Sequence, residues 1–387
     1  MPKNQRLKVG LVFDDSLDSN DGVAQAVKAI GAWLSKSGHE VSYLVGETKI
    51  GHWSGGKVYS LSKNISVNFN GNRLSIPLPA DKSRIKKVLD TEKFDVLHVM
   101  MPYSPFLAQR LIKIASPRTA IVATFHILPS GLLAKVGSVI LAVAQRVNIK
   151  RIQMVISVSQ PAADFAKKTF KVDSKVIPNP IDLSYYTLQK KLQDTNTTKK
   201  VVFLGRLVKR KGCEELIKAF ALFYNAQAPQ NIRLVIAGSG PQSEKLIKLA
   251  SKLKIADKTD FLGYIDEQDK SKLLASADLA CFPSLYAESF GIVLLEAMAS
   301  GSKVVIGGDN PGYSSVLAEK PELLFNPSNT QEFADKLRHM LSETKLLESL
   351  HNWQTNEVKK YDINVIGPMV VEVYESAIAA LAKKSHN

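Results

Sequence analysis

Two glutamates, Glu288 and Glu296, stand eight residues apart around the start of an apolar segment. The apolar run Asp278–Phe282 is typical of a strand, and a helix is expected to begin near Ser289, a good N-cap residue. Over eight helical residues a chain rises about 12 Å and returns to nearly the same side. Carboxylates spaced in this way could hold two ends of one elongated, hydroxyl-rich ligand. The alternative is a surface glutamate before an ordinary helix.

The start of that helix suits an anion. Gly291 lets a ligand approach the backbone closely. The first turn of a helix also presents unpaired N–H groups and the positive end of the helix dipole. The segment therefore predicts a position for a phosphate beside the two carboxylates.

A basic loop, Gly205–Gly212, follows an expected strand at Lys200–Gly205 and precedes a helix. Its four cations lie at the carboxyl end of a strand, where ligands bind in parallel sheets. A diphosphate leaving group needs such neutralisation, because negative charge grows on it as the bond breaks. Arg206 and Lys211 are the expected contacts, and a solvated basic turn is the alternative. The residue order is not that of a Walker loop.

Two further candidates stand at strand ends in the first half of the chain. His126 ends the apolar strand Thr119–Phe125, where it could hydrogen-bond a sugar hydroxyl or donate to developing charge. A structural histidine with satisfied hydrogen bonds is an equally good interpretation. Gly22 stands where the first loop meets the first helix, expected from about Val23 to Ser37, and could let backbone N–H groups face a phosphate. The first strand lacks G-x-G-x-x-G, so a nicotinamide dinucleotide site is not expected.

Two helical segments combine basic and apolar residues. The helix Lys82–Asp90 carries a basic set that fits an anionic membrane surface, with a solvated helix face as the alternative. That set is Lys82, Arg84, Lys86 and Lys87. A second helix with the apolar positions Leu132, Leu133, Val136, Val139, Ile140 and Val143 has the same character. We expect this second helix to pack in the core, with a lipid-facing role as the alternative.

Strands and helices alternate along the chain, which predicts parallel sheets covered on both faces, an α/β class. We expect a first Rossmann-like domain over residues 1–180 and a second over 181–363, joined near the proline-rich segment 176–182. Residues 364–387 are expected to form a helix that packs back on the first domain. Two doubly wound domains facing each other would leave a cleft outside the carboxyl ends of their strands.

The totals narrow the function further. The 387 residues suffice for two domains, and the formal charge of +15 requires an electronegative partner. Cys213 and Cys281 form no disulfide framework, which favours a reducing compartment. We expect no signal peptide and no membrane span. No metal-ligand spacing occurs, and the basic segments lack the interleaved aromatics of a nucleic-acid surface.

With these residues in place, the chain resembles the family 4 retaining glycosyltransferases of the GT-B fold over nearly its whole length. The motifs that carry the resemblance are Gly22-Val23, Ser37–Val41, Phe94–His98, Thr124–His126, Ile177–Asn179, Gly205-Arg206 with Lys211-Gly212, and Glu288–Glu296 with Ala297–Gly301. Within the family the chain looks most like the membrane-associated phosphatidylinositol mannosyltransferases. It departs from them where the acceptor binds: Asp21 stands for a glycine, Asp15 for an aromatic residue and Tyr103 for an asparagine.

The resemblance implies a nucleotide-sugar site held mainly by the second domain. Arg206 and Lys211 would hold the diphosphate, Glu288 the sugar hydroxyls and Glu296 the ribose. The remaining contacts that it implies are Ile265 and Lys270 near the base, the backbone of Ser289, Phe290 and Gly291, and His126 and Gly22 from the first domain. It implies no metal, and catalysis by positioning and leaving-group stabilisation.

The sequence thus predicts a retaining hexosyltransferase at the cytoplasmic side, peripheral at the inner face of the cell membrane. The donor would be GDP-mannose or a UDP-hexose, and the acceptor a membrane lipid such as a phosphatidylinositol-type lipid. A soluble family 4 enzyme acting on a small sugar or polysaccharide is one alternative. A basic nucleic-acid-binding protein is another, although no nucleic acid is expected as a partner.

Overall fold

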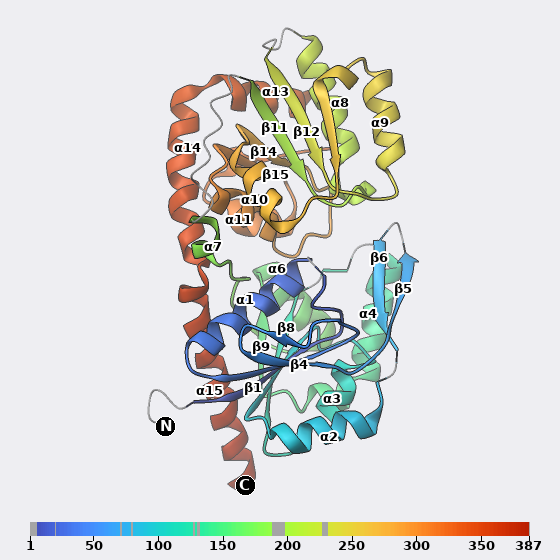
Figure 1. The fold of residues 1–387 in the computed structure, drawn as a ribbon, viewed down its shortest axis with the longest axis vertical. Helices are drawn as coiled ribbons and strands as arrows, with labels where there is room; N and C mark the ends of the chain where they lie inside the picture. The colour runs from blue at the N-terminus through green and yellow to red at the C-terminus, as the bar shows by residue number, and fades with distance from the viewer. Residues whose placement is uncertain are drawn as a thin grey trace. The chain divides into compact units, whose positions relative to one another are not determined.

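The computed structural model describes residues 6–19, 21–69, 72–78, 80–126, 128–129, 132–187, 198–226 and 231–386. The chain divides into two compact units. Unit 1 comprises Met1–Pro180 and Ile363–Asn387, and unit 2 comprises Ile181–Asp362. Each unit has its own sheet with helices beside it (Figure 1).

Unit 1 is built on a sheet with the strand order β10-β9-β8-β7-β1-β2-β4-β3, in which only β3 runs antiparallel to its neighbour among the described strands. The strands are β1 (Lys8–Phe13), β2 (Glu40–Val45), β3 (His52–Trp53), β4 (Gly56–Ser60), β7 (Val96–Met100), β8 (Ala120–Phe125), β9 (Met154–Ser157) and β10 (Lys175–Val176). A separate antiparallel pair is formed by β5 (Asn64–Phe69) and β6 (Asn72–Pro77). The central strands are buried throughout, as parallel strands covered on both faces must be.

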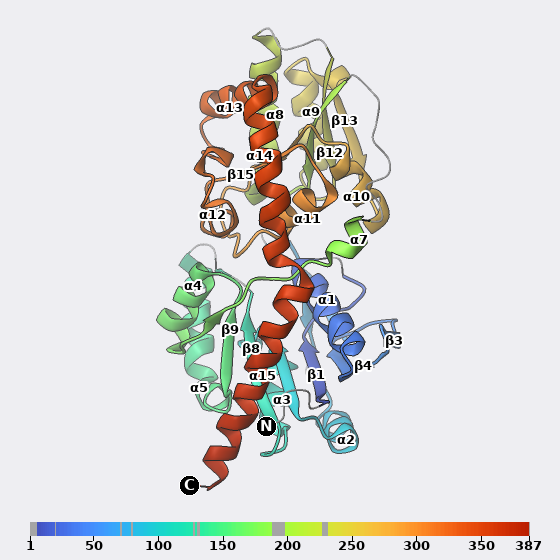
Figure 2. The ribbon, with the colours of Figure 1, turned by 90° about the vertical axis from the view of Figure 1, so that its left-hand side faces the viewer.

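The helices of unit 1 are α1 (Gly22–Lys36), α2 (Lys82–Glu92), α3 (Ala108–Ile114), α4 (Leu132–Ala144), α5 (Arg146–Ile149), α6 (Gln160–Phe165), the π-helix η1 (Ala166–Phe170) and α15 (Ile363–His386). One buried cluster joins α1 and α15 to one face of the sheet. A second cluster joins α2 and α3 to the other face. Figure 2 shows α15 lying along the strands β8 and β9, which it contacts.

Among the described residues, α15 is the one helix long and apolar enough to cross a membrane, with a mean hydropathy of 1.5 over Ile363–Lys384. Its inner side packs into the unit 1 core through Ile366, Val370 and Tyr374, all of which are buried. The Tyr374 hydroxyl also lies 2.8 Å from Nδ1 of the buried His98. These contacts make α15 part of the unit 1 core.

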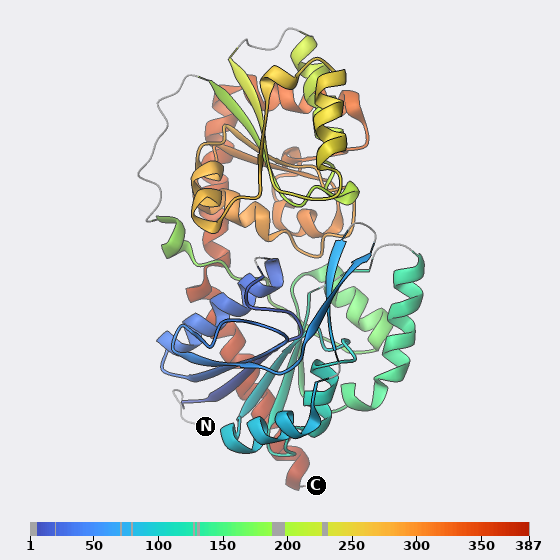
Figure 3. The same ribbon diagram turned by 45° about the vertical axis from the view of Figure 1, so that its right-hand side comes forward.

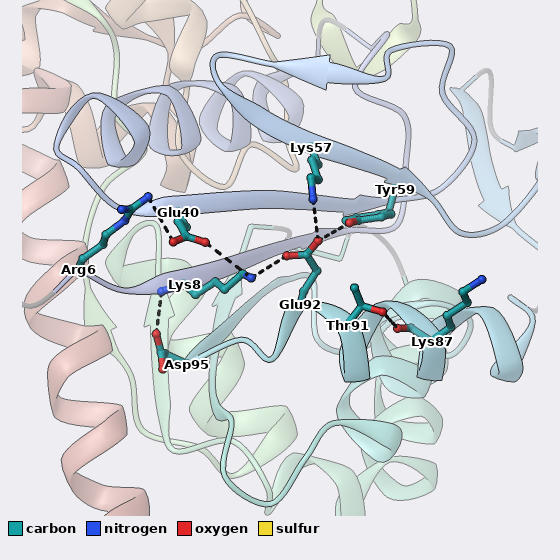
Figure 4. A network of polar contacts seen from close by, with 9 residues as sticks. All are labelled: Arg6, Lys8, Glu40, Lys57, Tyr59, Lys87, Thr91, Glu92 and Asp95. Carbon is teal, nitrogen blue, oxygen red and sulfur yellow. Dashed lines mark hydrogen bonds and ion pairs between the residues drawn. The ribbon is translucent and has the colours of Figure 1, made fainter.

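A polar network holds the C-terminal end of α2 against the sheet (Figure 4). The buried Glu92 carboxylate pairs with Lys8 at 3.0 Å and with Lys57 at 3.4 Å, and it accepts a hydrogen bond from the Tyr59 hydroxyl. Burial works to raise the pKa of Glu92, but its hydrogen bonds and the two lysines lower it, so the carboxylate is charged. The network fixes one end of the basic helix α2.

Unit 2 is built on a parallel sheet with the strand order β13-β12-β11-β14-β15-β16. The strands are β11 (Lys199–Leu204), β12 (Ile232–Ala237), β13 (Thr259–Gly263), β14 (Leu279–Phe282), β15 (Val304–Gly308) and β16 (Leu324–Phe325). The α-helices are α7 (Leu183–Thr187), α8 (Cys213–Asn225), α9 (Ser243–Lys252), α10 (Glu267–Ala275), α11 (Ile292–Ser300), α12 (Pro311–Leu317), α13 (Thr330–Ser342) and α14 (Thr344–Glu357). The 3-10 helices are η2 (Lys209–Lys211), η3 (Ala256–Lys258), η4 (Pro321–Leu323) and η5 (Val358–Tyr361).

The predicted α/β class with two parallel sheets is confirmed. The sequence did not indicate β13, which adds an edge strand to unit 2 and ends in Gly263. Its five residues are mostly half-buried or exposed, so they lack the continuous apolar run of the central strands. The strand places Ile265 and the start of α10 at the carboxyl edge of the sheet.

Candidate active site

The basic loop after β11 folds back against the loop after β14. Its last residue, Gly212, has φ +71°, and a Cβ there would lie 1.9 Å from the Pro283 carbonyl oxygen. Only glycine permits this approach. The close contact brings the cations of η2 beside the loop that carries Glu288.

Glu288 lies between two of these cations. Its Oε1 is 2.8 Å from the Arg210 guanidinium and 2.8 Å from Lys211 Nζ. All three side chains are largely buried, with exposed fractions of 12% to 19%. Arg210 was not among the residues predicted from the sequence, because four cations in one turn give no sign of which one faces inward.

Burial and mutual charge act against each other on the pKa values of this cluster. Burial works to raise the pKa of Glu288, but the charges of Lys211 and Arg210 outweigh it and leave this pKa below its ordinary value. Burial lowers the pKa of Lys211, and Arg210 and Arg206 add to that effect. Glu288 opposes it by favouring the charged ammonium. Arg206 is exposed and close enough to act on Lys211, so the predicted residues Arg206, Lys211 and Glu288 share one region.

The helix after Glu288 begins later than predicted. α11 starts at Ile292, and its N-cap is Gly291, with φ +122°, rather than Ser289. A Cβ on Gly291 would lie 2.6 Å from Cδ1 of Tyr313, so the chain turns there and Ser289 stays in the loop. Phe290 is buried and makes a T-shaped contact with Tyr361, 5.8 Å between ring centroids. The prediction that both glutamates lie on one side of this helix is therefore wrong, because Glu288 precedes it.

Glu296 occupies a second ionic cluster inside unit 2. Its Oε1 lies 2.6 Å from Lys270 Nζ, and the same ammonium lies 2.6 Å from Glu267 Oε1. Glu296 and Lys270 are both buried. Burial lowers the pKa of Lys270, but the two carboxylates outweigh it and leave this pKa raised. Lys270 and Glu296, predicted separately as donor contacts, thus form an ion pair, and Ile265 lies half-buried just before α10.

In unit 1, His126 is buried at the end of β8, with Nε2 3.3 Å from the Met100 sulfur. Burial lowers the pKa of His126 to about 4, against the opposing effects of Asp21 and a hydrogen bond with Asn179. The imidazole is therefore neutral near pH 7. It can exchange hydrogen bonds with a neutral ligand but does not supply a positive charge.

Gly22 is the first residue of α1, one residue before the expected start near Val23, but a carboxylate already serves that helix end. The Asp21 side chain accepts hydrogen bonds from the backbone N–H groups of Val23 at 2.9 Å and Ala24 at 3.0 Å. A phosphate at this position would have to compete with Asp21. The predicted phosphate contact of Gly22 stays a prediction.

Two family models match successive parts of the chain: Glycosyltransferase Family 4 over residues 20–185, and Glycosyl transferases group 1 over residues 186–359. A phosphatidyl-myo-inositol mannosyltransferase of Mycolicibacterium smegmatis is 30% identical over 384 residues, which cover 97% of this chain and 95% of that protein. A protein of the same name from Mycobacterium tuberculosis is 30% identical over 393 residues, covering 97% and 99%.

The chain belongs to glycosyltransferase family 4. Solved structures share the fold of this family 4 glycosyltransferase. Sucrose-phosphate synthase of Thermosynechococcus elongatus aligns with a TM-score of 0.75 at 19% identity, covering 96% of this chain and 100% of that chain. HepE of Anabaena, in complex with UDP and glucose, aligns with a TM-score of 0.72 at 17% identity, covering 96% and 100%. The predicted GT-B fold and the predicted glycosyltransferase class are confirmed.

The predicted membrane helix α2 contributes charge but no outward apolar face. Its residues Ile85 and Val88 are buried in the unit 1 core, while Lys82, Arg84, Lys86 and Lys87 are exposed. Lys86 pairs with Asp90 at 2.6 Å. Membrane binding by these four cations stays a prediction.

The second amphipathic segment differs from its prediction. Val136, Val139, Ile140 and Val143 on α4 were expected to pack in the core, and they are instead 49% to 72% exposed. Periodicity reveals an apolar stripe on a helix but not what the stripe faces, and here it faces solvent. The other two predicted positions, Leu132 and Leu133, belong to residues 132–135, whose side chains the structure does not describe.

Proposed function

We propose that this enzyme transfers a hexose, with mannose the first candidate, from a nucleoside-diphosphate sugar to a membrane lipid, with retention of anomeric configuration. The observation that carries the proposal is the cluster in which Arg210 and Lys211 each lie 2.8 Å from Glu288. It unites the chemistry that a sugar diphosphate needs, cations for phosphate and a carboxylate for hydroxyls. The relatives named phosphatidyl-myo-inositol mannosyltransferase support mannose and a phosphatidylinositol-type lipid.

The cations act on the leaving group in this proposal. The anomeric carbon's bond to the β-phosphate oxygen breaks, and its bond to the acceptor oxygen forms on the same face. The acceptor proton passes to the departing phosphate, so the products are the glycoside and a nucleoside diphosphate. Arg206 and Lys211 stabilise the negative charge that grows on the diphosphate, and no metal is required.

Glu288 has two tasks in this scheme. It accepts hydrogen bonds from sugar hydroxyls, and it holds Lys211 and Arg210 in position until the diphosphate enters. The two cations are therefore already in position before the donor binds. A phosphate that then arrives beside Lys211 competes with Glu288 for its ammonium group. Glu296 and Lys270, with Ile265, are proposed to bind the ribose and base.

The acceptor sets the location of the enzyme. A lipid acceptor requires peripheral binding at the inner face of the cell membrane, where nucleotide sugars are available. The basic helix α2 would then supply attraction to anionic lipids, with about 1 kcal/mol for each cation close to the surface.

A donor screen tests the proposal. Thermal unfolding is measured with GDP-mannose, UDP-glucose and an ADP-sugar in the presence of EDTA. At one hundred times its Kd, the true donor should stabilise the folded chain by about 2.7 kcal/mol. Turnover is then measured with extracted membrane lipids or with soluble sugars as acceptors. No stabilisation by any nucleotide sugar, or transfer to soluble sugars alone, would contradict the proposal.

Arg206 is tested against a matched neighbour. Arg206→Ala should lower kcat about 100-fold, in line with the loss of one charge-stabilising group. Lys209→Ala removes an exposed cation from the same loop and should leave kcat close to that of the unaltered enzyme. Equal losses in both variants would mean that the loop acts only through its overall charge.

A further inference from the structure

A stripe of apolar side chains faces solvent along α4 and α5. Val136, Val139, Ile140, Val143 and Val147 are 49% to 78% exposed. The Gln145 N–H donates to the Leu141 carbonyl and the Ile149 N–H to the Gln145 carbonyl, both at 3.0 Å, so the helical path is continuous. At about 100° per residue, the five side chains fall within an arc of about 100°. This is the width of the apolar face that a globular helix normally turns toward the core.

The inner face of the same helices is held to unit 1 by polar and apolar contacts. The Gln145 side chain is buried and donates to the Tyr103 carbonyl at 2.6 Å. The Asn148 amide donates to Gln109 at 2.8 Å, and the buried Ile149 packs beside Phe125. The inward side therefore combines hydrogen-bonding groups with apolar ones, while the valines face outward. Figure 3 shows α4 at the margin of unit 1.

We infer that this outward stripe, Val136 to Val147, is the surface that inserts into an anionic lipid layer. The inference deepens the proposed function and rests on its lipid acceptor. Inserting a contiguous apolar face is favourable in a bilayer interface, and exposing it to water is not. The stripe thus supplies the apolar half of membrane binding that α2 lacks, because the apolar side of α2 is buried.

The charge around the stripe selects an anionic surface. Residues 96–163 contain seven Lys and Arg and no Asp or Glu. Arg146 and Lys150 are exposed on the same helical segment, next to Val147 and three residues after it. Unit 1 as a whole has 27 Lys and Arg against 14 Asp and Glu, a formal charge of +13, whereas unit 2 has 24 against 22, a charge of +2. Like charge disfavours a second copy at this face, and anionic lipid headgroups complement it.

Vesicle flotation tests the inference. Val143→Asp places a charge in the middle of the stripe, and Val365→Asp places the same charge on another exposed valine of unit 1, on α15. With vesicles of phosphatidylcholine and phosphatidylglycerol, Val143→Asp should lower vesicle binding at least about tenfold, because one inserted side chain is lost. Val365→Asp lies outside the stripe and should bind close to the unaltered chain. Because both variants change the net charge equally, a difference between them reports insertion and not charge.

Salt and lipid composition separate insertion from simple attraction. Part of the binding should survive high salt, which screens lysines and arginines but not apolar contact, and that part should vanish in Val143→Asp. Vesicles of phosphatidylcholine alone should bind weakly. Equal binding by both variants, or binding abolished entirely by salt, would overturn the inference. So would self-association in ultracentrifugation that Val143→Asp abolishes while vesicles remain unbound.

Measuring donor binding separates this test from the test of the proposed function. Stabilisation of Val143→Asp by the nucleotide sugar should match that of the unaltered chain, because Val143 is not among the proposed donor residues and most of these lie in unit 2. Normal donor binding without vesicle binding by any variant would remove the lipid surface and leave the donor chemistry standing. Vesicle binding without stabilisation by any nucleotide sugar would retain the surface and refute the proposed reaction.

Discussion

Unit 2 places the buried acidic and basic side chains of its candidate site in ion pairs, whereas burial shifts the pKa values of Asp14 and His126 toward the neutral form at the corresponding end of the unit 1 sheet. In unit 2, Glu288 has two cations and Lys270 has two carboxylates. In unit 1, burial lowers the pKa of His126 to about 4 and raises that of Asp14 to about 7. Where burial outweighs the neighbouring charges and hydrogen bonds, the neutral form is favoured, and where ion pairs outweigh burial, the charge is retained. The difference supports the proposal that unit 2 binds the diphosphate of the donor.

Removal of the Glu288 carboxylate should have the largest effect on the ionic cluster of unit 2. Glu288→Ala leaves Lys211 and Arg210 repelling each other and removes the acceptor for sugar hydroxyls. We expect kcat to fall about 1000-fold, the upper range for loss of one charge-aligning group. Steady-state kinetics with the donor found in the screen measures the effect.

Glu288→Gln serves as the control for folding, since it keeps shape and hydrogen-bonding capacity. It should unfold close to the temperature of the unaltered chain while remaining strongly impaired in turnover. A rate within a fewfold of the unaltered enzyme in both variants would remove Glu288 from the reaction.

The second cluster tests whether pairing, rather than burial alone, sustains charge in unit 2. Lys270→Met leaves Glu296 buried without its cation, which should cost about 3 kcal/mol of unfolding free energy. Replacing both members, as Lys270→Met with Glu296→Leu, should recover most of that loss. Urea denaturation measures both variants. A single variant as stable as the unaltered chain would show that Glu296 protonates or reaches water at little cost.

The sequence predicts which kinds of charged residue line the candidate site of unit 2, but it does not predict the ion pairs between them. Lys211 and Glu288 are 77 positions apart, so no local spacing joins them. Arg210 was missed because the orientation of η2 decides which cation faces inward. Ser289 favours an earlier helix start, because serine is a common N-cap residue. The positive φ of Gly291 delays the start of α11 to Ile292.

The neutral groups of unit 1 were harder to predict. A histidine at a strand end is equally compatible with a functional role and with a structural hydrogen bond. Its charge depends on its burial, which the sequence does not give. The same holds for the valines of α4. Their spacing predicts an apolar stripe, but the buried Gln145 on the opposite side shows which face is anchored, and a hydrophobic period contains no such information.

The lowered pKa values of two histidines in unit 1 should make folding stability depend on pH. His98 and His126 have pKa values lowered by burial to about 3 and about 4, below the ordinary 6.5. Between pH 6.5 and 5.5 the unfolded chain therefore gains protons that the folded chain does not bind. Folding stability should fall as pH falls, by about 1 kcal/mol for each histidine over this interval.

Asp14 opposes the histidines in the same window. Burial raises its pKa from 3.8 to about 7, so between these values the folded chain holds a proton that the unfolded chain releases. Its contribution to stability grows as pH falls through 7. Asp14→Asn should therefore steepen the loss of stability on acidification, and His126→Asn should make it shallower, both by about 1 kcal/mol per pH unit. Thermal unfolding between pH 7 and 5 distinguishes them, and parallel curves for both variants would mean that these groups are charged in the folded chain.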